Sequence, residues 1–142
     1  MKKIVLLLCA AMMVFLIAGC TKDGDEFVGT YKLIQTKQTE HPDEIHSFIV
    51  ISRENDKVFK MEDYFLEKHK AIGILDKDRI TNSKTVKAAE MVNKQLKNNN
   101  GTWYINKDGN LVKDKFIYER ISDKPLDYTD FKVEGFPEPT ER

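Results

Sequence analysis

Cysteine is almost absent from this chain. Only two cysteines occur in 142 residues, Cys9 and Cys20, and both precede the polar part of the sequence. The chain after residue 26 therefore has no disulfide of its own and no cysteine nucleophile. Its stability must come from packing alone, and a chain of this length can bury a workable core.

Glycine is also scarce, with seven residues in all. The spaced glycines of a dinucleotide-binding turn and the P-loop pattern are both missing, so a backbone cradle for phosphate is not expected. No serine stands in a G-x-S-x-G frame, and paired carboxylates such as Glu62-Asp63 are expected on a hydrated strand face. The sequence predicts a protein that is not an enzyme and needs no cofactor.

Neither sign of charge is in excess. The 23 basic residues balance the 23 acidic ones, and the formal net charge is zero. Because the basic residues form no stripe along the chain, we expect no nucleic-acid partner.

One long apolar run is present, at residues 4–18, directly after Lys2 and Lys3. About 20 apolar residues are needed to cross a bilayer, so this run is short for a membrane span. Its length and basic start are typical of a signal peptide. The run leads into Ile17, Ala18, Gly19 and Cys20. These four residues resemble the bacterial lipobox, in which a branched apolar residue and two small ones precede a cysteine.

The resemblance implies a lipoprotein, the alternative being a plain N-terminal anchor helix. Diacylglycerol would be attached to the Cys20 thiol, and an acyl chain such as palmitate to the amine freed by cleavage. Residues 1–19 would be the removed signal peptide, recognised through Ile17, Ala18 and Gly19, and residues 20–26 a lipidated tether. In similar lipoproteins an Asp after the cysteine favours the inner membrane. Thr21 therefore implies the periplasmic face of the outer membrane, or the cell membrane if the host has only one.

Alternating and β-rich stretches predict about six strands. They lie at 27–39, 46–52, 57–67, 69–76, 102–106 and 111–122. Asp108-Gly109, between the last two, is a hairpin signal. One helix is predicted at about 84–98, because apolar residues recur there at helical spacing. Those residues are Val86, Ala89, Val92 and Leu96.

The predicted fold class is α+β: a small antiparallel, barrel-like sheet of about six strands with one helix. A cystatin-like helix on a sheet is the alternative. We expect one periplasmic β-rich domain at 27–121 and an irregular tail at 122–142, which holds three of the four prolines. The aromatic residues of the tail, Tyr128, Phe131 and Phe136, are expected to pack back on the sheet.

The first predicted strand contains Gly29-Thr30-Tyr31. It resembles the opening of lipocalin-like domains, where a Gly-x-Trp closes the base of the barrel, with Tyr31 in place of the tryptophan. In "YERI" near the end, Arg120 would suit a last strand that carries an arginine toward that aromatic ring. The resemblance implies a barrel that carries or senses a small apolar ligand.

The best metal candidate is "HPDEIH", which places four candidate ligands in six residues: His41, Asp43, Glu44 and His46. A zincin needs its two histidines four apart on a helix, whereas these are five apart and a proline follows the first. We expect a solvated loop here and no metal site.

Three classes of function stay open. The first expectation is a non-catalytic, membrane-anchored protein-binding module of immunity or inhibitor type, which an exposed apolar patch would favour. A lipocalin-like carrier would need an internal apolar pocket, and an envelope enzyme a cleft where histidines and carboxylates converge. Six aromatic residues on the predicted strands would either fill the core or line a ligand cup: Phe48, Phe59, Phe65, Trp103, Phe116 and Tyr118.

Overall fold

The computed structural model describes residues 22–34, 44–71, 73–74 and 77–142. A 3₁₀ turn and four strands build the first half: η1 (Asp25–Phe27), β1 (Gly29–Leu33), β2 (Glu44–Arg53), β3 (Val58–His69) and β4 (Arg79–Val92). Four short strands follow: β5 (Gln95–Asn98), β6 (Gly101–Ile105), β7 (Leu111–Lys113) and β8 (Phe116–Ser122). The chain ends with one helical turn and a short strand: α2 (Tyr128–Phe131) and β9 (Thr140–Glu141).

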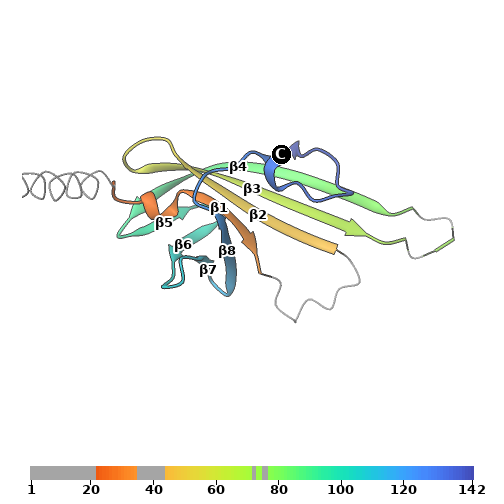
Figure 1. The fold of residues 1–142 in the computed structure, drawn as a ribbon, viewed down its shortest axis with the longest axis horizontal. Coiled ribbons are helices and arrows are strands. Elements are labelled where there is room, and N and C mark those ends of the chain that lie inside the picture. Colours follow the sequence, from red (N-terminus) through yellow and green to blue (C-terminus); the bar gives the residue numbers. More distant parts are fainter. Residues whose placement is uncertain (1–21, 35–43, 72, 75–76) are drawn as a thin grey trace, which may run out of the picture.

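The strands β1 to β8 close into an antiparallel barrel. Each strand pairs with the next along the chain, and β8 returns to pair with β1. The result is an up-and-down barrel of eight strands, lipocalin-like in shape. In Figure 1 the long strands β2, β3 and β4 extend beyond the short strands, so only part of their length is enclosed. The fold class is therefore mostly β rather than α+β. The cystatin-like alternative needs a long helix on the sheet, whereas the described residues hold only the single turn α2 and the 3₁₀ turn η1.

The helix predicted at 84–98 is wrong. Residues 79–90 pair continuously with β3, from His69↔Arg79 to Val58↔Glu90. Asn93 and Lys94 then take φ values of 51° and 62°, the left-handed geometry of a tight hairpin turn, and β5 returns along β4. Helical spacing was misleading because Val86 faces outward and is exposed, while Leu96 lies in the barrel. Cross-strand packing outweighs the local pattern here.

The count rises from six strands to eight because β4 and β5 stand where the helix was predicted, while two further differences cancel each other. The strand expected at 69–76 is not found among the described residues of that range, because β3 itself runs to His69. The stretch at 111–122 is divided into β7 and β8 by a turn in which Asp114 has a φ of 51°. The hairpin predicted at Asp108-Gly109 is confirmed, with Gly109 donating its amide to the carbonyl of Asn106 at 3.0 Å.

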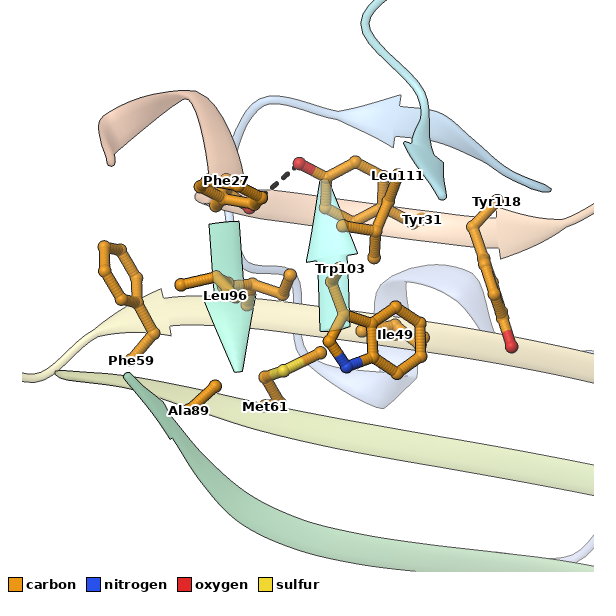
Figure 2. Packing of buried hydrophobic residues seen from close by; sticks show 11 residues of the cluster. Phe27, Tyr31, Ile49, Phe59, Met61, Ala89, Leu96, Trp103, Leu111 and Tyr118 are labelled. Carbon is orange, nitrogen blue, oxygen red and sulfur yellow. Dashed lines mark hydrogen bonds between the residues drawn. The ribbon is translucent and has the colours of Figure 1, made fainter. Parts of the chain in front are cut away.

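The main core fills the barrel (Figure 2). Alternate residues of each strand point inward, as pleating requires. The inward apolar side chains include Tyr31, Ile49, Phe59, Met61, Ala89, Leu96, Trp103, Leu111 and Tyr118, with Phe27 from η1. Phe27 and Tyr31 are both fully buried, so this end of the barrel is closed.

A second core lies outside the barrel, between its wall and the tail. The outward residues of β2 and β3, such as Phe48 and Tyr64, are covered by the last 20 residues of the chain. The rings of Phe48 and Phe131 lie 4.8 Å apart, and Tyr64 stacks on Tyr128 at 5.6 Å. Packing of the three tail aromatics on the sheet is thus confirmed, and the tail also forms α2 and pairs β9 with β4.

Candidate functional site

The closed end of the barrel is built around Tyr31 and Arg120, as the lipocalin-like resemblance implies. The guanidinium carbon of Arg120 lies 4.8 Å from the centre of the Tyr31 ring. Arg120 donates to the carbonyls of Val28 at 2.9 Å and Gly109 at 3.2 Å, and also to that of Glu26. The Tyr31 hydroxyl donates to the carbonyl of Phe27 at 2.8 Å (Figure 2), and burial raises its pKa. Both side chains thus donate to backbone carbonyls of the barrel, so the role of this pair is structural.

Charged residues lie on the inner face of the barrel, next to the apolar core. Asp63 follows Met61 by two residues on β3 and therefore points inward, as do Lys87 on β4 and Lys113 on β7. Burial raises the pKa of Asp63, while the charges of Lys113 and Lys87 act in the opposite direction. No cation among the described residues lies within 4.0 Å of the Asp63 carboxylate, so it forms no direct ion pair there. The expectation that Asp63 lies on a hydrated strand face is wrong.

Trp103 borders these charges. Its side chain is buried, yet its indole nitrogen has no hydrogen-bond partner among the described residues. Figure 2 shows that nitrogen directed across the barrel toward Met61. The Lys113 ammonium lies 5.0 Å from the centre of the indole ring. The barrel interior thus holds a free donor beside a cation.

Tyr118 completes the inner set. Its ring lies 5.8 Å from that of Trp103. Burial raises the pKa of the Tyr118 hydroxyl, the charge of Asp63 raises it further, and a hydrogen bond with Ser47 opposes them. Four strands, β3, β4, β7 and β8, therefore bring ionisable groups to one region of the interior.

The end of the barrel opposite Tyr31 is reached by solvent. Phe65 and Phe116 share the inward face with Asp63 and Tyr118, yet their side chains are 41% and 45% exposed. The six aromatic residues that the sequence places on strands therefore fall into three groups. Phe59, Trp103 and Tyr118 fill the barrel, Phe48 lies under the tail, and Phe65 and Phe116 border the open end.

The outer wall carries an apolar row across four adjacent strands. Tyr104 on β6 is in register with Val112 on β7, which is in register with Ile117 on β8, and Ile34 follows β1 beside Ile117. These four residues, which we name the outer row, point away from the core. Tyr104, Ile117 and Ile34 are 40–42% exposed, and only Val112 between them is buried. The sequence signal was present, since each outer-row residue stands next to an inward apolar one, but the alignment of the strands could not be read from it.

The predicted lipobox residues Ile17, Ala18, Gly19 and Cys20 lie outside the described residues, as do His41 and Asp43. Of the metal candidate, Glu44 and His46 are described, and their side chains pair with each other at 2.8 Å. Within the described ranges, no three His, Cys, Asp or Glu side chains gather closely enough to hold a metal ion. No helix in those same ranges is long and apolar enough to cross a membrane.

Comparison with protein-family models, with curated proteins and with solved structures finds no match for this chain. The clues to its function therefore lie in the barrel itself and in its inner and outer faces.

Proposed function

We propose that this protein is a bacterial lipoprotein whose barrel is a non-catalytic protein-binding module of the cell envelope, of immunity or inhibitor type. The outer row is the observation that carries the proposal. Partly exposed apolar side chains that are contiguous across four strands are typical of a surface that binds another protein.

The chemistry beside the outer row suits a protein partner. Lys32 on β1 and Glu119 on β8 are opposite each other in the strand register, at the outward positions next to Ile34 and Ile117. Both are exposed. Protein interfaces commonly combine an apolar centre with a charged rim, since the rim selects partners while the centre supplies most of the affinity. The partner would present an apolar ridge flanked by one acidic and one basic group.

The lipid on Cys20 would place the barrel close to the membrane. A tether of six or seven residues spans at most about 20 Å when extended. Diacylglycerol together with an N-acyl chain holds a protein stably, whereas a single chain gives only marginal binding. The proposed location is the periplasmic face of the outer membrane, where the partner would be an envelope protein or an incoming one.

Replacing Cys20 with Ser is expected to abolish lipid attachment and cleavage before residue 20, because the serine hydroxyl cannot form the thioether. Mass spectrometry of the mature N-terminus measures both effects. An unmodified Cys20 in the unsubstituted protein, or cleavage at another bond, would contradict the lipoprotein assignment.

A photo-crosslinking residue placed at Ile117 in living cells is expected to give one discrete adduct, which mass spectrometry then identifies. A second substitution in the row, Tyr104→Lys, should remove most of the adduct, because a charge in an apolar interface centre costs about 2 kcal/mol or more. Both positions are partly exposed, so the fold should be nearly unaffected.

The matched control is Val86, an exposed apolar residue on the outer face of β4 and outside the outer row. A probe there should give no such adduct. Equal labelling from Val86 and Ile117, or no adduct from Ile117, would refute the docking role. An adduct between two copies of this chain would mean that the outer row mediates self-association and does not bind an envelope protein.

A further inference from the structure

We propose that the open end of the barrel binds a small organic anion. Its acid group would lie between Lys87 and Lys113 and accept from the Trp103 indole, and its apolar body would lie against Phe65 and Phe116. This inference depends on the inner face of the barrel alone and is independent of the outer row.

One buried donor on this face lacks an acceptor among the residues that the structure describes. The indole N–H of Trp103 is buried and has no partner among the described residues. Such donors are rare in folded proteins, because burial without a hydrogen bond costs free energy. The Lys87 ammonium donates to Asn100 Oδ1 at 2.7 Å, which uses one of its three protons and leaves two. A ligand oxygen would satisfy the indole and pair with the ammonium groups at once.

The balance of charge favours an anion. Two ammonium groups and one carboxylate face this part of the barrel, which leaves one positive charge in excess. The groups that face Asp63 are Lys87 from β4, Lys113 from β7 and Tyr118 from β8, while β2 contributes the uncharged Ser47 and Ile49. A bound anion would be attracted by the two lysines and repelled by ionised Asp63.

The apolar part of the ligand also has partners. Phe65 and Phe116 point to the same face and are partly exposed, so a bound hydrocarbon would remove their surface from water. Polar groups beside apolar surface are the usual composition of a small-molecule site. The ligand would therefore be amphipathic, with one acid group and a short apolar chain or ring.

The experiment titrates the full chain, in a non-ionic detergent, with octanesulfonate and with octanol. Octanesulfonate is charged at every pH used, and octanol supplies the same apolar chain without charge. Trp103 is the only tryptophan in the sequence, so its fluorescence reports occupancy directly. The change seen with empty micelles is subtracted.

We expect octanesulfonate to change the Trp103 emission saturably and octanol to bind much more weakly. Lys113→Met should weaken octanesulfonate about tenfold, since a charge-assisted contact is lost. Asp63→Asn should have the opposite effect and strengthen binding, because it removes the repelling carboxylate and keeps the shape. Lys97→Met, an exposed lysine on β5, is the matched control and should change nothing.

The pH dependence supplies a second readout. Burial already raises the pKa of Asp63, and a bound anion would raise it further, so binding should strengthen as pH falls through that pKa. Asp63→Asn should remove this dependence. The proposal is overturned if octanesulfonate and octanol bind alike, or if Lys113→Met and Asp63→Asn change affinity no more than Lys97→Met. Should Lys113→Met fail to fold, Asp63→Asn decides alone, because the amide has nearly the size and shape of the carboxylate it replaces.

Discussion

Leu96→Asp is expected to destabilise the protein by roughly 4 kcal/mol or more, since it combines truncation of a core side chain with an unpaired buried charge. Leu96 is fully buried at the centre of β5, in register with Trp103 on β6 and Met91 on β4. The inward face of this strand has no cation next to that position among the described residues. Small domains are typically stable by about 5–15 kcal/mol, so this one change should remove much of the total.

Denaturant unfolding of a lipid-free chain beginning at Thr21 measures the loss. Lys94→Asp is the control, two residues away in the turn before β5. Lys94 is exposed and has a φ of 62°, a conformation that Asp tolerates, so the expected change is a few tenths of a kcal/mol. Similar, small losses for both substitutions would mean that β5 does not close the barrel.

Tyr31→Ala is expected to destabilise the same chain by about 3–5 kcal/mol, the usual cost of removing a buried aromatic ring. Tyr31 is fully buried, and its ring lies under the Arg120 guanidinium. Loss of the ring removes a core contact and also the surface on which Arg120 is positioned. The three carbonyls that accept from Arg120 connect η1, β8 and the turn before β7, so several strands should weaken together.

Tyr31→Phe distinguishes the contribution of the ring to stability from that of the hydroxyl. It retains the contact with Arg120 and loses the hydrogen bonds of the hydroxyl to the carbonyls of Phe27 at 2.8 Å and Glu26 at 3.4 Å, which should cost about 0.5–1.5 kcal/mol. Thermal unfolding followed by circular dichroism compares the two variants. Equal losses would assign the stability of the closed end to the hydroxyl and contradict the role given to the ring.

The sequence supports part of the fold and part of the site for specific reasons. β1 to β3, the Asp108-Gly109 hairpin and the packed aromatics of the tail follow from alternation, turn chemistry and apolar content. The pair of Tyr31 and Arg120 was anticipated from a short resemblance at the two ends of the barrel. The strands, the hairpin and the tail depend on residues that are neighbours in sequence. The Tyr31–Arg120 pair depends on one short motif in the first strand and another in the last.

Residues 84–98 show where this reasoning fails. Val86, Ala89 and Leu96 fit a helical face as well as they fit two strands, and only the pairing of β4 with β3 along its whole length decides between them. The functional surfaces could not be predicted from the sequence for a related reason. Asp63, Lys113 and Trp103 come from three strands, and the outer row comes from four, so neither can be seen before the register is known.

By itself the sequence determined that the chain after residue 26 folds without a disulfide and that it is rich in β-structure. The resemblance of Ile17 to Cys20 to a lipobox is also read from the sequence alone, and the lipoprotein assignment that it implies stays a prediction. These are local or compositional properties, which a single chain displays directly. The tertiary structure decided that eight strands close into a barrel and which residues face its inside. Closure depends on β8 meeting β1 across about 90 residues of sequence, and the free energy of such long-range pairing is set by the assembled core rather than by any segment of the chain.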